Sequence, residues 1–434
     1  MENKRDLPKV LIVDVNAWRE DAASHTLLDI FRCWDSEKLA LVYTSSELPY
    51  NEHCHKYFQI GESQIIRSVI KPWMKVGREV ENTAKSNDAA ARAERERSKN
   101  VHKRQPKWIR LAREVVWKLG GWKTPALKKF VKDFDPDIVF VPIFPYAYMG
   151  RIQKYVSTMA NKPTVCYLAD DNYSYESCHN IYDYLQRFWT RQYVGPLARK
   201  SNQMFVIVDK EKEDTDSRFG TDSVILTKSI DFTGKSYQHR EPNKPLKFVY
   251  TGSMVIGRDK TLALLADAIN AVNEQIGEVR AEMYIYSQTE PKEEVLARIN
   301  NGAAHFCGRI GREEVLKVQQ EADVVVFAES LEGKEANAAK LSFSTKITDY
   351  ISNGKCVMAI GKDYIAPIDY FQRNDSALIA HSSDEIKARV EAIVDNPMIT
   401  DVYGEKAFNC AVRNHEKNMM NERFIATMLK AWKK

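Results

Sequence analysis

A hydroxyl-rich turn, a lysine and a carboxylate occur together at 344–349 of this 434-residue chain. Ser344, Thr345 and Lys346 come first, and Asp349 follows three positions later. Ser344 or Thr345 can cap a helix that begins at this point. The first turn of a helix offers unpaired N–H groups and the positive end of the helix dipole. The spacing therefore predicts a phosphate-binding turn.

A second group of candidate phosphate ligands follows the apolar run at 246–251. Gly252 and Ser253 form a turn in which glycine lets the backbone approach a ligand. Arg258 and Lys260 lie at the start of the next predicted helix, where a guanidinium and an ammonium can hold a diphosphate. The alternative for Arg258 is an ordinary solvated surface arginine. A strand, a glycine and a helix are by themselves common to every Rossmann-like unit.

Short apolar runs position both groups. Two of them, at 322–328 and 356–360, are uninterrupted, as expected for parallel strands covered on both faces. The helix expected between them ends at Asn353-Gly354. The result is a strand, loop, helix, strand unit. Because 434 residues exceed one ordinary core, we expect two α/β domains of about 200 residues each.

The pattern Ser-Thr-Lys-x-x-Asp-Tyr-x-x-x-Gly-Lys-x-Val at 344–357 resembles the donor-site signature of family 4 glycosyltransferases. The resemblance implies an α/β fold with two Rossmann-like domains whose parallel sheets face a central cleft (GT-B). It places Asp349 against the ribose of a sugar nucleotide, and the turn with Lys346 against the diphosphate. The family's second Glu, eight positions earlier, is Leu341 here, so its donor-sugar contacts cannot be transferred.

The resemblance implies further contacts in both domains. It assigns Arg258 and Lys260 to the nucleotide diphosphate, and Arg309 and Ile310 to the base, although Ile310 can equally be buried core. In the first domain the loop after the first strand would face the acceptor. The candidates there are Trp18, Arg19 and Asp21. Read as a plain structural loop, the same three residues would be solvated.

Two adjacent acids follow the predicted strand at 164–168. Ligands of open α/β sheets bind beyond the carboxyl ends of strands, where Asp170 and Asp171 lie. Family members commonly carry a cleft residue at this place. Either carboxylate can orient or deprotonate an acceptor hydroxyl. The alternative is a pair that caps the next helix.

The expected domain layout follows from these elements. Residues 1–232 form an N-terminal acceptor domain with a helical, basic insertion at about 63–132. Residues 245–405 form the donor domain, and 406–434 form a C-terminal helix that packs back toward the first domain. In the resembling fold such a helix couples its end to domain closure.

The basic insertion carries its charge unevenly. Between Lys99 and Lys132 eleven Lys or Arg residues accompany one acid, Glu114. Trp108, Trp117 and Trp122 are interleaved with them. A basic, tryptophan-bearing amphipathic stretch can contact an anionic membrane surface. The alternative is a helical hairpin whose apolar face packs on its own domain, and nucleic-acid binding is disfavoured.

Several chemistries are disfavoured by what the sequence lacks. The seven cysteines form no Cys-x-x-Cys pair, and no His-x-x-x-His or Gly-x-Ser-x-Gly motif occurs. We therefore expect no metal site, no cofactor and no disulfide framework. No apolar run is long enough to span a bilayer, and no signal peptide is evident, so we expect a cytoplasmic location, on the inner face of the membrane if the insertion binds there.

The expected activity is retaining transfer of a glycosyl unit from a nucleotide-diphosphate sugar to a hydroxyl acceptor. A lipid-linked acceptor in bacterial cell-surface polysaccharide or glycolipid synthesis would suit the basic insertion. Two alternatives stay open. One is a sugar-nucleotide epimerase of the same fold, and the other is a non-catalytic subunit that binds nucleotide sugar.

Overall fold

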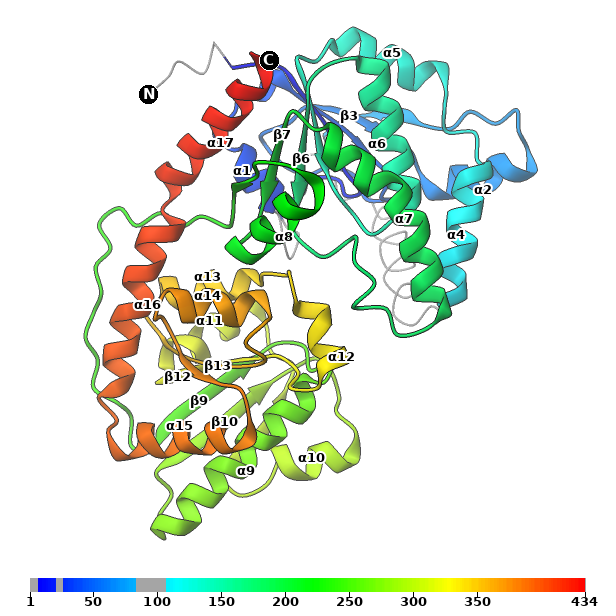
Figure 1. The fold of residues 1–434 in the computed structure, drawn as a ribbon. Coiled ribbons are helices and arrows are strands. Elements are labelled where there is room, and N and C mark those ends of the chain that lie inside the picture. The colour runs from blue at the N-terminus through cyan, green and yellow to red at the C-terminus, as the bar shows by residue number, and fades with distance from the viewer. Residues whose placement is uncertain (1–6, 21–25, 83–106, 434) are drawn as a thin grey trace. The chain divides into compact units, whose positions relative to one another are not determined.

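The computed structural model describes residues 7–20, 26–82 and 107–433. Residue contacts divide the chain into two units, each built on a largely parallel sheet with helices on both faces (Figure 1). Unit 1 contains Met1–Val206, Lys212–Leu226 and Asn421–Lys434, and unit 2 contains Ile207–Glu211 and Thr227–Met420. The predicted α/β class with two Rossmann-like domains is confirmed.

The sheet of unit 1 has the strand order β4-β3-β2-β1-β5-β6-β7-β8. Its strands are β1 (Val10–Val13), β2 (Leu39–Tyr43), β3 (Lys56–Gln59), β4 (Arg78–Val80), β5 (Ile138–Pro142), β6 (Thr164–Leu168), β7 (Gln203–Val206) and β8 (Val224–Ile225). All pairs are parallel except β3 with β4. The strand order reverses between β1 and β5, which pair from Val10 and Ile138 onward. Open sheets bind ligands at such a switch point.

Helices cover both faces of this sheet. They are α1 (Thr26–Phe31), α2 (Glu62–Ile70), α4 (Lys107–Leu119), α5 (Pro125–Phe134), α6 (Ala147–Ala160), α7 (Ile181–Lys200) and most of α8 (Asp209–Phe219) and α17 (Lys417–Trp432). Phe424 of α17 lies 5.0 Å from Phe31 and 5.6 Å from Phe205, ring centre to ring centre. Both partners are fully buried, so the last helix completes one face of this core.

The insertion at 63–132 is less helical than expected, because β4 adds an antiparallel edge strand to it. Its tryptophans divide between core and surface. Trp117 is buried and stacks on Tyr148 at 4.5 Å, and Trp122 is buried edge-on against Tyr155 at 5.3 Å. Trp108 is exposed. Most of this segment therefore packs on its own unit, and the part at 99–106 lies outside the described residues.

The sheet of unit 2 has the order β11-β10-β9-β12-β13-β14, with parallel pairs throughout. Its strands are β9 (Leu246–Thr251), β10 (Ala281–Tyr286), β11 (Ala304–Gly308), β12 (Val324–Ala328), β13 (Cys356–Ile360) and β14 (Leu378–Ala380). Every residue of β12 and β13 is buried, as the uninterrupted apolar runs predict. Here the strand order reverses between β9 and β12, which creates a second switch point.

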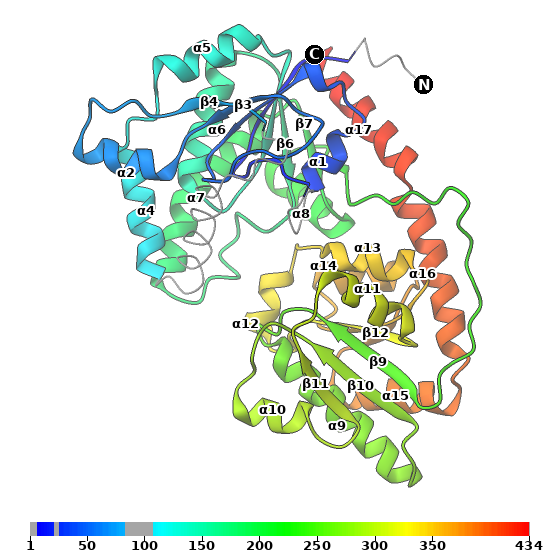
Figure 2. The same ribbon diagram turned by 180° about the vertical axis from the view of Figure 1, so that it is seen from behind.

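Two layers of helices enclose this second sheet (Figure 2). The helices are α9 (Arg258–Ile276), α10 (Glu293–Ile299), α11 (Arg312–Glu321), α12 (Gly333–Ala336), α13 (Thr345–Ser352), α14 (Ala366–Arg373), α15 (Ser383–Asp395) and α16 (Ile399–His415). Ser344 caps α13 by accepting the backbone N–H of Lys346, as the sequence predicts. Glu416 adopts extended backbone and separates α16 from α17, so the long helical stretch expected at the C-terminus is two helices.

Candidate functional site

The predicted phosphate ligands of unit 2 gather at the switch between β9 and β12. Gly252 follows β9, Arg258 begins α9, and Lys346 lies in the first turn of α13. The Lys346 ammonium donates a hydrogen bond of 2.9 Å to the backbone carbonyl of Thr251. A Cβ atom on residue 252 would lie 2.5 Å from that ammonium, so a larger residue there would displace the Lys346 side chain.

Arg258 is held by a carboxylate that the sequence analysis did not single out. Its Nε and Nη2 atoms donate to Glu329 at 2.9 and 2.7 Å. Glu329 directly follows β12, and its side chain is buried. The hydroxyl of Thr261 in α9 donates to the Glu329 backbone carbonyl at 2.9 Å. This bidentate pair fixes the guanidinium plane at the carboxyl end of the sheet.

The protonated form of Lys346 is disfavoured in this arrangement. Partial removal from water and then the nearby Arg258 guanidinium lower the pKa of its ammonium, while Glu329 and Asp349 oppose the shift. Two cations thus lie close together with one fully buried carboxylate between β12 and α9. A bound dianion would relieve the repulsion between the cations, so the cluster is suited to a phosphate or diphosphate group.

Asp349, the predicted ribose carboxylate, lies one turn further along α13. Its carboxylate accepts a hydrogen bond from the Lys228 ammonium, which belongs to the same unit. The side chains of Ser344 and Thr345 are half-buried at the start of the helix. A ribose hydroxyl at Asp349 would compete with Lys228, and a ribose contact stays a prediction.

The remaining donor-side candidates lie around this cluster. Ser253 Oγ is 3.2 Å from Thr289 Oγ1, so its hydroxyl faces the loop after β10. Lys260 forms an exposed pair at 2.7 Å with Glu332, which lies three residues after Glu329. Arg309, which is exposed, and Ile310, which is half-buried, follow β11. Because β11 lies two strands from β9, they are about 10 Å away along the sheet.

Unit 1 has a pocket of about 390 Å³ at its own switch point. Its walls come from the carboxyl ends of β1, β5 and β6 and from α1. The lining residues that carry polar or charged side chains include Asp14, Asn16, Trp18, Arg19, Glu47, Asp170 and Asn172. Three carboxylates, those of Asp14, Glu47 and Asp170, therefore line one concave site.

The Asp14 side chain is buried in the wall of this pocket. Burial raises the pKa of its carboxyl to about 6, although the backbone N–H groups of Asn16 and Val15 stabilise the ionised form. Its Oδ1 atom accepts from the Val15 N–H at 2.6 Å. A carboxyl group with a pKa near 6 can exchange a proton with a ligand at neutral pH. The sequence analysis did not select it.

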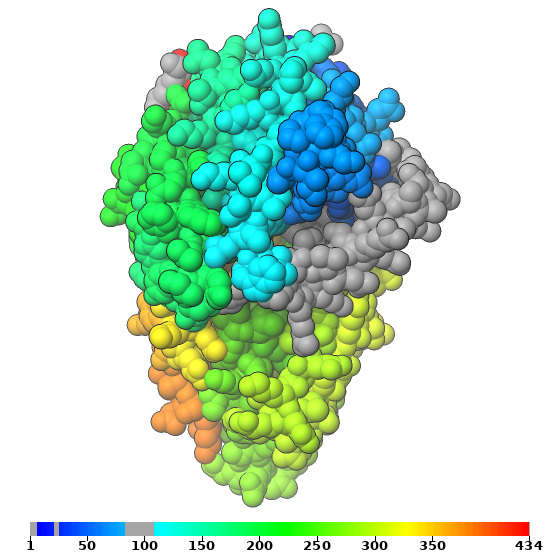
Figure 3. Space-filling model, turned by 90° about the vertical axis from the view of Figure 1, so that its right-hand side faces the viewer, coloured from blue at the N-terminus to red at the C-terminus, as the bar shows by residue number. Residues whose placement is uncertain are grey.

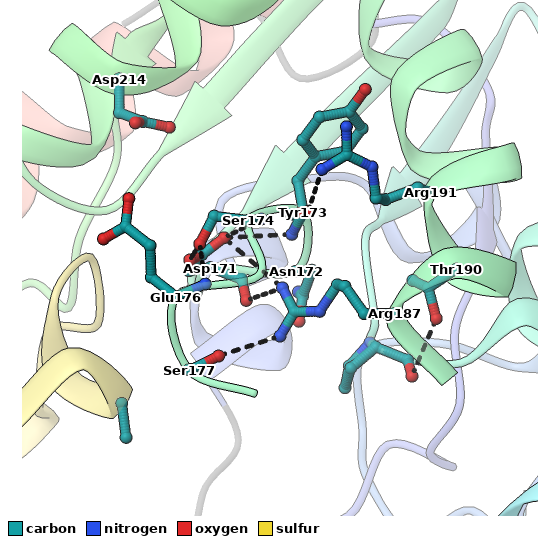
Figure 4. A network of polar contacts seen from close by, with 12 residues as sticks. Asp171, Asn172, Tyr173, Ser174, Glu176, Ser177, Arg187, Thr190, Arg191 and Asp214 are labelled. Carbon is teal, nitrogen blue, oxygen red and sulfur yellow. Dashed lines mark hydrogen bonds and ion pairs between the residues drawn. The ribbon is translucent and has the colours of Figure 1, made fainter. Parts of the chain in front are cut away.

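Asp170 and Asp171 separate into different environments. Asp170 is exposed and lines the pocket. The Asp171 carboxylate turns into its own loop, where it accepts from the N–H groups of Tyr173 and Ser174 and pairs with Arg187 at 3.5 Å (Figure 4). Burial opposes ionisation of Asp171, but these hydrogen bonds and the arginine outweigh it and lower its pKa. Asp171 orders the loop that presents Asp170.

Two of the three residues predicted to face the acceptor, Trp18 and Arg19, line this pocket. Trp18 is buried in the pocket wall, 5.5 Å from Phe31, rather than solvated. Arg19 also lines the pocket, and its guanidinium donates to the Leu48 carbonyl and lies 5.7 Å from the Tyr50 ring. Asp21 lies outside the described residues. Two of the three candidates thus contribute to one cavity with Asp14.

Comparison with known proteins places this geometry in a known fold. The chain matches no protein-family model and no curated protein. Anabaena HepE, crystallised with UDP and glucose, aligns with 97% of this chain and 99% of its own (TM-score 0.59, 12% identity). The chain has the GT-B fold. Sucrose-phosphate synthase from Thermosynechococcus elongatus aligns over 95% of this chain and 96% of its own, with a TM-score of 0.58 and 10% identity. A putative UDP-N-acetylglucosamine 2-epimerase from Listeria monocytogenes aligns over 96% of this chain and 95% of its own, with a TM-score of 0.51 and 11% identity.

Within this GT-B chain, Asp14 and Glu329 are the functional candidates that sequence reasoning missed. Each is the single acid directly after an apolar strand of four or five residues. That position, at the carboxyl end of a parallel strand, is the signal that could have identified both. Among the residues that the structure describes, no group of three His, Cys, Asp or Glu side chains could hold a metal ion.

Proposed function

We propose that this protein is a retaining glycosyltransferase that uses a UDP-sugar as donor. The observation that carries the proposal is the cluster of Arg258 and Lys346 at the β9–β12 switch, beside the hydroxyl turn of α13. HepE, which has the same fold, was crystallised with UDP and with UDP-glucose.

The cluster suits the charge that develops in glycosyl transfer. As the bond between the anomeric carbon and the diphosphate breaks, its electron pair stays with the departing UDP. Arg258, Lys346 and the N-terminus of α13 stabilise that negative charge without reorganising, because Glu329 and the Thr251 carbonyl already hold the two cations. The acceptor oxygen forms the new bond to the anomeric carbon, and its proton passes to the Asp170 carboxylate.

The pocket of unit 1 supplies the acceptor side of the proposal. Asp170 accepts a hydrogen bond from the acceptor hydroxyl and orients its oxygen. Asp14, with its raised pKa, binds or releases a proton near neutral pH. Trp18 gives the pocket an aromatic wall, which is a common surface for sugar rings. Asp171 acts through the loop it orders.

The proposed pathway is bacterial cell-surface polysaccharide or glycolipid synthesis in the cytoplasm, on a lipid-linked acceptor at the inner face of the membrane. No helix among the described residues is long and apolar enough to cross a bilayer. A peripheral contact would bring the enzyme to such an acceptor. The charge of the region around α4 supports this part of the proposal.

Calorimetric titration with UDP, GDP, dTDP and CMP tests the donor site. We expect UDP to bind most tightly and Lys346→Ala to weaken it by at least tenfold, because the variant loses a cation at the diphosphate. Arg298→Ala is the matched control, since Arg298 pairs with Asp267 on the exposed surface of α9 and α10 in the same unit. No binding of any nucleotide by the wild type would contradict the proposal.

Incubation with UDP-sugars separates transfer from the alternatives. Release of UDP that depends on an added hydroxyl acceptor, with a product of unchanged anomeric configuration, supports retaining transfer. Conversion of the UDP-sugar alone would favour an epimerase, a class represented by the Listeria protein of the same fold. Binding without turnover under any acceptor would indicate a non-catalytic subunit.

A further inference from the structure

Helix α4 exposes an apolar stripe to solvent. Trp108, Ala112, Val115 and Leu119 follow one another at intervals of four, three and four residues, so they lie on one side of the helix. All four are exposed, Trp108 by 56% and Leu119 by 65%. The opposite side, with Trp117, is the one that packs into the core. The stripe is thus additional to the apolar side that folding requires.

Helix α2 and the turn after it expose a second stripe beside the first. Ile66, Val69, Ile70 and Trp73 continue one side of this helix, and Ile70 and Trp73 are 74% and 79% exposed. Two contacts fix α2 along α4. Arg113 pairs with Glu62, and the Ser68 hydroxyl accepts the Gly121 N–H at 3.1 Å. Figure 3 shows α2 (blue), α4 (cyan) and α7 (green) next to one another on this face.

The exposed charges around the two stripes are of one sign. Between 62 and 75 and between 108 and 119 the exposed cations are Arg67, Lys71, Lys75, Arg110 and Lys118. The same two described segments contain two acids, Glu62 and Glu114. Glu62 is engaged by Arg113, and Glu114 is buried against Arg151 at 3.1 Å. Both acids are neutralised within the fold, so the face carries an excess of positive charge.

We propose that this face, formed by α2, residues 71–75 and α4 and here called the α2–α4 face, docks onto an anionic lipid bilayer. Exposed tryptophan and aliphatic side chains enter the interfacial region, and the flanking lysines and arginines contact lipid phosphates. A second copy of the chain would bring like charges together across the same surface. That docking brings the enzyme to a lipid-linked acceptor rests on the proposed function. The binding of this face to a bilayer does not.

The residues that perform this docking differ from those that the composition of 99–132 suggests. Trp117 and Trp122 are core residues, and their replacement would unfold unit 1 rather than test a membrane contact. Trp73, Ile70 and Leu119 are the informative positions, because their side chains contribute little to the core.

Flotation of the full chain with vesicles tests the proposal. Vesicles of phosphatidylcholine with 30% phosphatidylglycerol are compared with phosphatidylcholine alone. We expect binding to the anionic vesicles, weakening of that binding in 0.5 M salt, and an at least tenfold loss in the double variant Ile70→Ser/Trp73→Ser. The charge variant Lys71→Glu/Lys118→Glu should lose a similar factor.

A matched control places the same loss of apolar surface elsewhere. Ile276→Ser/Val279→Ser replaces two exposed apolar residues at the end of α9 in unit 2 and should leave vesicle binding unchanged. Each variant is checked for the UDP affinity and unfolding midpoint of the wild type, which separates lost docking from lost folding or a wrong donor site. Absence of vesicle binding by the wild type, or self-association that the Ile70→Ser/Trp73→Ser change abolishes, would overturn the proposal.

Discussion

Asp14 lines the pocket of unit 1, and its burial there destabilises the ionised carboxylate. Its folded-state pKa of about 6 lies above the ordinary value of 3.8. The folded state therefore binds more protons than the unfolded state between these values, and stability falls as the pH rises through this window. At pH 7 the whole penalty applies, and it amounts to about 3 kcal/mol.

The variant Asp14→Asn should therefore be more stable than the wild type at pH 7, by up to about 3 kcal/mol, and equal to it below about pH 4. Urea unfolding at several pH values measures the difference. Asp222→Asn, at an exposed position, should show no such dependence. We also expect loss of glycosyl transfer with UDP binding retained. A variant less stable than the wild type at pH 7 would show that the charged form is needed for the fold.

Arg258 and Glu329 allow a second prediction at the scale of residues. Arg258→Ala leaves the buried Glu329 carboxylate without its partner and should cost about 3 kcal/mol of stability. Adding Glu329→Gln should recover most of that stability, but not the UDP affinity. Thermal unfolding followed by circular dichroism, together with calorimetric titration, checks both parts. Equal UDP affinity in the double variant and the wild type would exclude Arg258 from the diphosphate site.

The sequence identifies candidate residues well where a local pattern surrounds them. Ser344, Lys346 and Arg258 stand at helix starts next to apolar strands, and the structure brings Arg258 and Lys346 together. The position of Glu329 directly after an apolar strand marks it as a candidate, but its pairing with Arg258, 71 residues away, has no local pattern. Whether a side chain after a strand is buried depends on elements that arrive from elsewhere in the chain.

At the scale of elements, the side chain of Lys355, in the loop before β13, binds the C-terminal end of α11. Its ammonium donates to the backbone carbonyls of Gln320 and Ala322 at the C-terminus of α11. Burial, the larger cause, and the charge of Arg240 lower its pKa to about 8. Between pH 8 and the ordinary value of 10.5 the unfolded state binds more protons, so the stability contributed by this group rises with pH.

The variant Lys355→Met should lack this rise. The stability of the wild type relative to the variant is expected to increase by up to about 3 kcal/mol from pH 7.5 to pH 10.5. Chemical unfolding of both proteins across this range measures the difference, which cancels the titration of other groups. A constant difference would mean that Lys355 titrates in the folded state as it does in the unfolded chain.

Element positions were predictable in the sheets and less so in the insertion and at the C-terminus. Apolar runs at 39–43, 164–168 and 356–360 coincide with β2, β6 and β13. The break at Glu416 carries no glycine or proline, and it arises where Lys417 N–H donates to the Ile230 carbonyl. β4 is a short, polar edge strand without alternation. Both features depend on tertiary partners rather than on local preference.

At the scale of the whole molecule, the eight tryptophans offer a selective probe. Trp18, Trp34, Trp73, Trp108, Trp117, Trp122, Trp189 and Trp432 all belong to unit 1. Tryptophan fluorescence therefore reports the unfolding of unit 1, whereas circular dichroism reports both units. The two signals together distinguish which unit a substitution affects.

Phe424→Ala should destabilise unit 1 by about 3–5 kcal/mol, because the ring fills a buried aromatic cluster with Phe31, Phe140 and Phe205. The midpoint of the fluorescence transition should shift to a lower urea concentration. The part of the circular dichroism transition that reports unit 2 should keep its midpoint. Trp432→Ala, at a partly exposed position of the same helix, is the control. An unchanged fluorescence midpoint would mean that α17 is dispensable for this core.

The position of Phe424 also governs when unit 1 can mature during synthesis. Its strands are translated by residue 226, but the helix that closes their aromatic face follows roughly 200 residues later. At about 5–20 residues per second, the ribosome needs roughly 10–40 s to supply it. The N-terminal sheet therefore waits with Phe31 and Phe140 uncovered while unit 2 is made. The half of the chain that is translated first therefore receives its last core helix only at the end of synthesis.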